Sequence, residues 1–394
     1  MGLTGSYVFS LMGFLFVAAS AFAQIPNYTI EGSAGTGKVI RNYPNFPDME
    51  APSLNGEVSF SKHCVGQKPW HRYYNFPRMG VSINGGSMGN DAVLGHYLAV
   101  MEEMTFEKRI GLNWFWAPQL SMGVAWFSKP HDEFDNPENV VIGSSFTFFV
   151  GARIMGGRRI SPKFDLIAKV GMLHASNSHF QLPNVGMNLP LVTMGIRYSL
   201  KPSKDVAEKT SQIDTTRLNT TQRIAFHARV ALGVNEFGSS TNPVNGNKYP
   251  VYLAAVYFSK MFSPVNKVTA GVEAWYNKGV YDFIVSQEFY DDKRHNKSCA
   301  AAITLGHEFL MGHFGLLTTG GIYFYNPFYK DRLEQNEIDG IKDNLKAYIP
   351  ARLGVQYYVK NTNYNDKNNL FVGVYIKTNF GQADFLEMGF GYMF

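Results

Sequence analysis

The chain is poor in the features that mark most other classes of protein of its size. Only 2 of its 394 residues are cysteine, and charged residues make up 17% of the sequence. Downstream of Gln24, no stretch approaches the ~20 consecutive apolar residues that a membrane-spanning helix needs. The 36 basic residues barely outnumber the 31 acidic ones and form no basic stripe. We therefore expect neither a helical membrane protein nor a nucleic-acid-binding protein.

The N-terminus has the pattern of a removable signal peptide, residues 1–23. An apolar run over residues 11–19 is too short to span a bilayer as a helix, and a small-x-small cleavage signature at Ala21-Phe22-Ala23 follows it. No cysteine follows the cleavage site to carry a lipid anchor. We expect export, and hence a compartment in which Cys64 and Cys299 are permitted to pair, although the sequence does not show that they meet.

What the mature chain has in abundance is glycine, aromatic residues and alternation with a period of two. The sequence contains 38 Gly, 31 Phe and 22 Tyr. In residues 268–277, apolar side chains alternate with polar residues and glycine, and residues 146–154, 192–200 and 352–360 repeat the pattern. This period places every second side chain on one face of a strand. Because the polar faces carry Arg, Lys, Glu and Gln beside glycines, we interpret them as lining a lumen and the apolar faces as contacting lipid.

The sequence therefore predicts an all-β protein, a transmembrane antiparallel β-barrel of about 14 strands (about 12–16), closed because lipid cannot satisfy a sheet edge. We expect residues 24–55 to form an N-terminal extension and residues 56–394 a single barrel in a bacterial outer membrane. The apolar stripe that ends at Phe394 resembles the closing strand of such barrels. The polar segment 201–222 is expected to be a loop within the barrel, with a boundary between two domains as the alternative. A soluble secreted β-sandwich is the alternative fold.

Two motif-like segments do not carry the chemistry that they suggest. The glycine-rich residues 32–38 have the spacing of a phosphate-binding loop, but Val39 replaces the magnesium-binding Ser or Thr and no strand is expected before it. His307, Glu308 and His313 lack zincin spacing, and alternation puts the two histidines on one face of a strand and Glu308 on the other. We expect a flexible N-terminus at residues 32–38, lumen or rim positions for His307, Glu308 and His313, and neither a metal nor a cofactor.

A candidate catalytic pair lies at the end of the strand expected at residues 163–175. His174 and Ser176 continue its apolar, lipid-facing stripe. Two residues apart on a strand, their Cα atoms lie roughly 6.6 Å apart, within reach of the hydrogen bond that a serine nucleophile needs from a general base. Asn177 follows and can offer an amide to a developing oxyanion. The alternative is an interfacial His and Ser at headgroup level.

These residues resemble the lipid A deacylase (PagL-like) family, whose longer members are named acyloxyacyl hydrolases. The specific part of the resemblance is the His-x-Ser-Asn core of residues 174–177. Further similar segments, spread over most of the mature chain, are Asn136–Asn139, Ile142–Ser144, Leu182–Asn188, Gly195–Tyr198, Lys377 and Ala383–Glu387.

The resemblance implies an outer-membrane serine esterase that removes an ester-linked acyl chain from lipid A of lipopolysaccharide. Ser176 would be the nucleophile, His174 the general base and Asn177 an oxyanion donor, on the outer wall of the barrel. The alternative is a non-enzymatic barrel: a pore, or an inactive family member with a structural or binding role.

The chain departs from the family at two positions near this core. Met187 and Asn188 stand where the family has a Glu, and His179 stands where it favours Gly. The partner that orients the imidazole would then be Asn188 or an acid brought near by the fold. The candidate acids are Glu308, Asp384 and Glu387.

Overall fold

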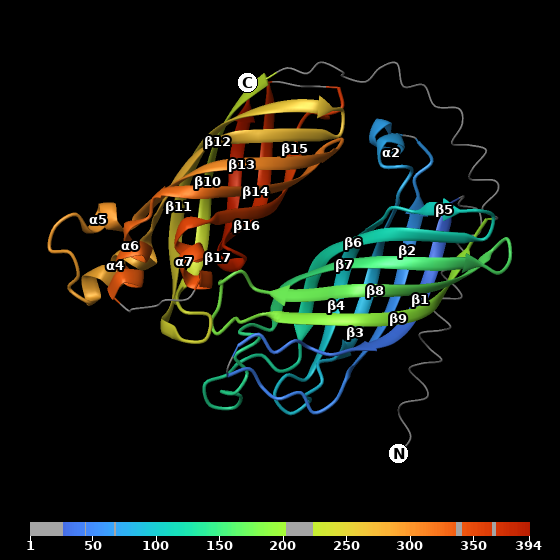
Figure 1. The fold of residues 1–394 in the computed structure, drawn as a ribbon, viewed down its shortest axis with the longest axis horizontal. Helices are drawn as coiled ribbons and strands as arrows, with labels where there is room; N and C mark the ends of the chain where they lie inside the picture. The colour runs from blue at the N-terminus through green and yellow to red at the C-terminus, as the bar shows by residue number, and fades with distance from the viewer. Residues whose placement is uncertain (1–26, 44, 67, 202–223, 336–340, 365–367) are drawn as a thin grey trace.

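Two closed antiparallel sheets lie side by side in the computed structural model (Figure 1). The structure describes residues 27–394 except 44, 67, 202–223, 336–340 and 365–367. The predicted signal peptide lies outside the described residues, and so does almost all of the predicted loop 201–222.

The first barrel consists of eight long strands, closed by pairing of β1 with β9 and of β4 with β6, and the short β5 adds to β6. Its elements are β1 (Tyr28–Gly37), β2 (Ser53–His63), α2 (Pro69–Tyr73), β3 (Arg78–Ser87), β4 (His96–Thr105), β5 (Lys108–Ile110), β6 (Trp114–Phe127), β7 (Phe146–Arg159), β8 (Phe164–Ser176) and β9 (Met187–Ser199).

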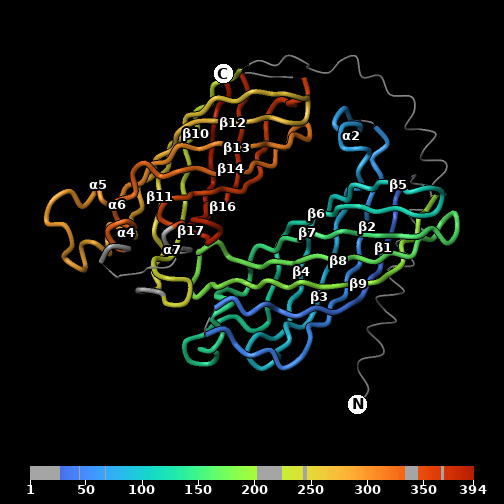
Figure 2. Tube along the Cα trace, in the orientation of Figure 1, coloured from blue at the N-terminus to red at the C-terminus, as the bar shows by residue number. Residues whose placement is uncertain are grey.

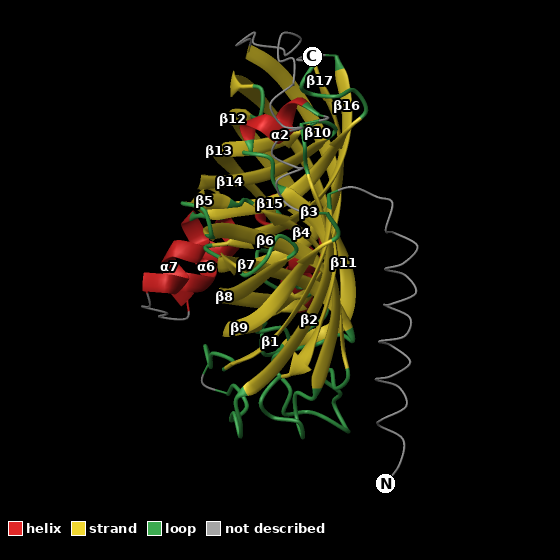
Figure 3. Ribbon diagram, turned by 90° about the vertical axis from the view of Figure 1, so that its right-hand side faces the viewer, coloured by secondary structure: helices red, strands yellow, loops and turns green. Residues whose placement is uncertain are grey.

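The second barrel closes by pairing of β10 with β17. Its helices gather at the end opposite the C-terminus, and Figure 3 shows α6 and α7 next to each other. Its elements are β10 (Ile224–Gly238), β11 (Pro243–Ser263), β12 (Asn266–Asn277), α4 (Lys278–Ser286), α5 (Arg294–Lys297), β13 (Cys299–Met311), β14 (Phe314–Tyr325), α6 (Pro327–Gln335), α7 (Ile341–Tyr348), β15 (Pro350–Tyr358), β16 (Asn369–Asn379) and β17 (Gln382–Met393).

The predicted all-β barrel class is confirmed, but the number of barrels differs from the prediction of one barrel over residues 56–394. One reason lies in β1, which falls within the predicted N-terminal extension of residues 24–55. The glycines of β1 allow the backbone of a neighbouring strand to approach closely, because a Cβ on Gly35 would lie 2.0 Å from the carbonyl oxygen of Val192 in β9. The segment that resembles a phosphate loop therefore supplies the strand that closes the first barrel onto β9.

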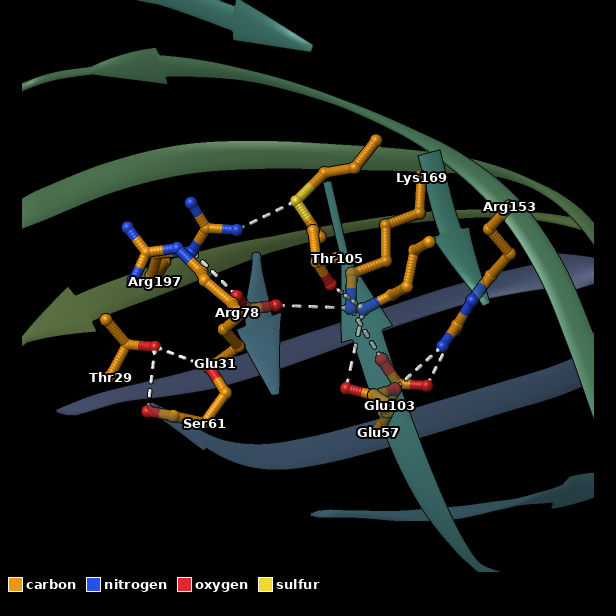
Figure 4. Close-up of polar contacts among 12 residues, drawn as sticks. Thr29, Glu31, Glu57, Ser61, Arg78, Glu103, Thr105, Arg153, Lys169 and Arg197 are labelled. Atoms are coloured by element: carbon orange, nitrogen blue, oxygen red, sulfur yellow. Dashed lines mark hydrogen bonds and ion pairs between the residues drawn. The ribbon is translucent and has the colours of Figure 1, made fainter. Parts of the chain in front are cut away.

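Charged side chains fill the lumen of the first barrel (Figure 4). The basic residues come from β3, β7, β8 and β9, and the acidic ones from β1, β2, β4, β8 and the β4–β5 turn. Complementary charges on facing strands offset the desolvation of each ion. The ion pairs include Arg153 with Glu57 (2.6 Å) and Glu103 (3.0 Å), Lys169 with Glu57 (2.6 Å) and Glu31 (3.2 Å), Arg197 with Glu31 (2.6 Å) and Glu107 (2.9 Å), and Arg78 with Glu107 (3.2 Å).

The second lumen is organised in the same way. Its buried ion pairs include Arg229 with Glu387 (2.6 Å), Arg352 with Glu387 (2.8 Å), Lys267 with Glu308 (2.6 Å) and Lys377 with Asp384 (2.6 Å). Cys64 and Cys299 are both free.

The outer walls carry apolar side chains between aromatic clusters. The rings of Phe226, Phe258 and Phe394 gather where the chain enters β10, with centroids 5.4 and 5.6 Å from Phe226. Tyr252, further along β11, pairs with Tyr276 of β12 at 6.5 Å. Along β11 the two clusters are ~20 Å apart, and apolar residues of the outer wall lie between them. Among the described residues, no helix is both long and apolar enough to cross a membrane.

The two barrels contact each other at both ends. Near the end where each barrel begins, the Tyr74 hydroxyl after α2 donates to the carbonyl oxygen of Val265 in the β11–β12 turn (3.0 Å). At the opposite end, the loop between β8 and β9 meets the β10–β11 hairpin, as the trace in Figure 2 shows. The barrels therefore have the same orientation, which is what insertion into one membrane requires.

Candidate active site

His174 and Ser176 lie on the outer wall at the end of β8, half-buried, in line with the exposed Val170 and Met172. This is the face that alternation predicts. The neighbouring strand β7 places Phe148 opposite Ser176. The pair therefore stands at the edge of an apolar wall.

Asn188 is the neighbour of His174 on β9, and its side chain meets the imidazole: Asn188 Oδ1 lies 2.9 Å from His174 Nδ1. An amide oxygen only accepts, so Nδ1 carries a proton, and in the neutral ring the lone pair is therefore on Nε2. This is the tautomer that a general base for serine needs. No hydrogen bond joins His174 to Ser176 within the described residues. The pair is open in this conformation, as catalytic pairs often are before substrate binds.

Two donors converge on the Ser176 hydroxyl. Asn184 donates through Nδ2 to Ser176 Oγ (3.0 Å), and the backbone N–H of Ser178 donates to the same oxygen (3.3 Å). Gly186 lies beside the pair with φ of +79°, and a Cβ there would be 3.4 Å from His174 Cε1. A side chain at this position would therefore lie against the imidazole of His174.

Asn177, the predicted oxyanion donor, uses its amide elsewhere in this conformation. Its Nδ2 donates to the carbonyl oxygen of Gln181 (2.6 Å) and to Ser144 Oγ (3.3 Å). The side-chain amide that donates to the Ser176 hydroxyl is instead that of Asn184. The sequence interpretation missed it, although Asn184 belongs to the Leu-Pro-Asn segment that resembles the family.

The three candidate acids do not reach His174, which corrects that alternative. Glu308, Asp384 and Glu387 point into the second barrel, where each binds a lysine or arginine. Asn188 is the partner of the imidazole among the residues considered.

His307 and Glu308 lie on opposite faces of β13, as alternation predicts, but His307 faces outward against the ring of Phe309 (4.3 Å between centroids) rather than into the lumen. His313 sits in the β13–β14 turn, where its Nδ1 lies 2.9 Å from the carbonyl oxygen of Tyr358. No cluster of three His, Cys, Asp or Glu that could hold a metal occurs in the described part of the chain.

The loop of residues 177–186 (the β8–β9 loop) carries the donors to Ser176 and is attached to the second barrel. The backbone N–H of Glu236 donates to the carbonyl oxygen of His179 (2.9 Å), and that of Asn184 donates to the carbonyl oxygen of Ser240 (2.7 Å). Burial lowers the pKa of His179 below its usual 6.5 despite the nearby carboxylates of Asp384 and Glu236, so the ring is neutral.

Residues 224–394, which form the second barrel, match the family described as acyloxyacyl hydrolase, C-terminal domain. The second barrel therefore resembles the C-terminal domain of acyloxyacyl hydrolases. The match does not include His174 and Ser176, so the candidate site lies in the first barrel, outside the matched residues.

Similar solved structures are outer-membrane proteins. The outer membrane enzyme PagL is 18% identical over 42% of this chain and 97% of its own (TM-score 0.30). Neisserial surface protein A is 13% identical over 44% of this chain and 96% of its own (TM-score 0.29). The COG4313 outer membrane channel from Pseudomonas putida F1 is 10% identical over 94% of this chain and 96% of its own (TM-score 0.17). No curated protein sequence matches the chain significantly.

Proposed function

We propose that the protein is an outer-membrane serine esterase that hydrolyses an ester-linked acyl chain of lipid A. The observation that carries the proposal is the pair on the outer wall of β8. His174 is held by Asn188 in the tautomer of a general base, and Ser176 Oγ receives two hydrogen bonds. A hydrolase of a soluble substrate has no reason to place these groups at the edge of an apolar outer wall.

Location in the outer membrane rests on the outer walls. Both barrels expose aliphatic side chains, and the second carries aromatic clusters at two levels, the arrangement that lipid and the two membrane interfaces favour. The pair lies at the loop end of β8, where the headgroups of one leaflet would meet the wall.

In the proposed reaction, Ser176 Oγ attacks the carbonyl carbon of the ester while His174 Nε2 accepts the hydroxyl proton. The attack forms a tetrahedral intermediate whose negative charge lies on the former carbonyl oxygen. Asn184 Nδ2 and the N–H of Ser178, which lie 3.0 and 3.3 Å from Ser176 Oγ, are donors close enough to the reacting carbon to stabilise this charge until the intermediate collapses. The imidazolium then gives its proton to the leaving sugar oxygen, and water releases the fatty acid from Ser176 by the same steps. The acyl chains lie along the wall beside Phe148 and Met172.

A pore is the weaker candidate, because both lumens are crossed by buried ion pairs. A barrel that only binds lipid remains the competing function, and it is separated from the esterase by chemistry at Ser176.

Purified, folded protein incubated with lipid A and with a p-nitrophenyl acyl ester tests the proposal. We expect release of fatty acid by the native protein, and loss of at least about 1000-fold in kcat for Ser176→Ala and His174→Ala. Ser161→Ala, in the turn at the other end of β8, is the matched control and should retain the native rate. A fluorophosphonate probe should label Ser176, as detected by peptide mass spectrometry. No turnover and no labelling of the folded native protein would refute the esterase.

A further inference from the structure

The second barrel does more than complete the fold. We propose that its β10–β11 hairpin holds the β8–β9 loop in the conformation that sets the donors on Ser176, and that Glu236 is the main positioning residue. This inference rests on the proposed esterase function and assigns to the second barrel a role in the site of the first barrel.

Glu236 contacts the β8–β9 loop through both its backbone and its side chain. It is 2% exposed, and its N–H donates to the carbonyl oxygen of His179 (2.9 Å). Its Oε2 accepts from the N–H of Leu182 (3.0 Å) and from Lys248 Nζ (2.6 Å). A hydrogen bond from a backbone N–H to a buried carboxylate is strong, because the acceptor is charged and water is excluded.

Asn184 links the second barrel directly to the nucleophile. Its backbone N–H donates to the carbonyl oxygen of Ser240 in the hairpin (2.7 Å), and its side chain donates to Ser176 Oγ (3.0 Å). A displacement of the loop at Leu182 therefore moves the amide on Ser176, two residues further along the chain.

The loop needs an external brace because its backbone is strained. Ser178 and His179 have φ of +58° and +67°, in the left-handed region that residues with a Cβ disfavour. His179 stands where the resembled family favours Gly. Its Nε2 lies 3.4 Å from the carbonyl oxygen of Gly238 in the hairpin, and its ring is buried. The departure from the family thus gives the loop an extra contact with the second barrel.

Three variants of the full-length protein separate the acceptor from the ion pair. Glu236→Ala removes both contacts of the carboxylate. Glu236→Gln keeps an oxygen that accepts from Leu182 but loses the charge, and Lys248→Met removes the ion pair alone. We expect kcat for the acyl ester to fall about 10- to 100-fold in Glu236→Ala with KM nearly unchanged, because misplaced donors affect the transition state more than binding. The other two variants should stay within about threefold of the native kcat.

Hydrogen exchange of the loop is the second measurement, and it does not depend on turnover. Amides of residues 179–186 should exchange faster in Glu236→Ala than in the native protein, Glu236→Gln or Lys248→Met, while strands of both barrels keep their protection. Folding is checked by heat-modifiable migration on gels. If Glu236→Ala does not fold, Glu236→Met fills the same space without accepting from Leu182 and replaces it.

Each outcome has one meaning. If Glu236→Ala keeps the native kcat although its loop amides exchange faster, the positioning role is overturned. It is also overturned if the loop amides of Glu236→Ala exchange at the native rate. An equal loss of kcat in Lys248→Met would also overturn it, since the ion pair and not the acceptor would then matter. A native protein without turnover would refute the esterase, while the exchange data would still show whether the second barrel holds the loop.

Discussion

Replacing Asn188 by Asp should make the site a faster esterase. The side chains are nearly isosteric, so the substitution puts a carboxylate oxygen where Asn188 Oδ1 now lies, 2.9 Å from His174 Nδ1. A carboxylate stabilises the imidazolium that forms when His174 takes the proton of Ser176, and a neutral amide does so less.

The size of the effect follows from the two kinds of hydrogen bond. A neutral hydrogen bond contributes about 1 kcal/mol and one to a charged group about 2 kcal/mol. The difference of about 1 kcal/mol corresponds to a gain of roughly fivefold in kcat. Because the charge on the imidazole appears only as the reaction proceeds, KM should change little.

Steady-state hydrolysis of the acyl ester by folded Asn188→Asp, Asn188→Leu and native protein measures this. Asn188→Leu leaves Nδ1 without its acceptor and should lower kcat about tenfold. If Asn188→Leu is as fast as the native protein and Asn188→Asp is no faster, Asn188 does not orient His174 and another group must.

Three further predictions concern the loop, the lumen and pH. Gly186→Ala should lower kcat and reduce the free energy of unfolding by about 1 kcal/mol. The reason is that φ of +79° is unfavourable for Ala, whose Cβ would also lie 3.0 Å from the carbonyl oxygen of Ala175. Native kinetics and an unchanged urea midpoint would contradict this. Arg197→Met should destabilise the barrel by about 3–5 kcal/mol in urea unfolding because it leaves Glu31 and Glu107 buried without this partner, whereas the exposed Lys163→Met should change stability by less than about 0.5 kcal/mol. The contribution of neutral, buried His179 to the loop contact is complete above pH 6.5 and is lost as the pH falls below it, because the opened loop then takes up the proton first. Loop protection, corrected for intrinsic exchange, should therefore fall on acidification in the native protein and not in His179→Gln; parallel behaviour of the two would refute the assignment.

Alternation in the sequence predicts most of the strands and their faces, because period two is a local property of each segment. Val170, Met172, His174 and Ser176 lie on the outer wall as their spacing indicates. The number of barrels is not local: it depends on which strands pair at the seams. β1 is rich in glycine and weak in apolar residues, so its pairing with β9 leaves little trace in its own sequence.

In the candidate site too, the sequence predicts the residues on strands but not those that the loops bring together. The pair and Asn188 sit on adjacent strands, where register fixes their distance, and Asn188 was one of the partners considered. Asn184 reaches Ser176 only through the path of the β8–β9 loop, and the acids in β13 and β17 are kept from His174 by the closure of the second barrel. Loop paths and barrel seams are long-range features that strand periodicity does not encode.

The most direct test of the esterase is mass spectrometry of lipid A from cells that express the native protein, Ser176→Ala or Ser161→Ala, each inserted and folded in the outer membrane. The account predicts that lipid A loses one acyl chain with the native protein and with Ser161→Ala, and keeps it with Ser176→Ala. Identical lipid A in all three would contradict a lipid A esterase at Ser176.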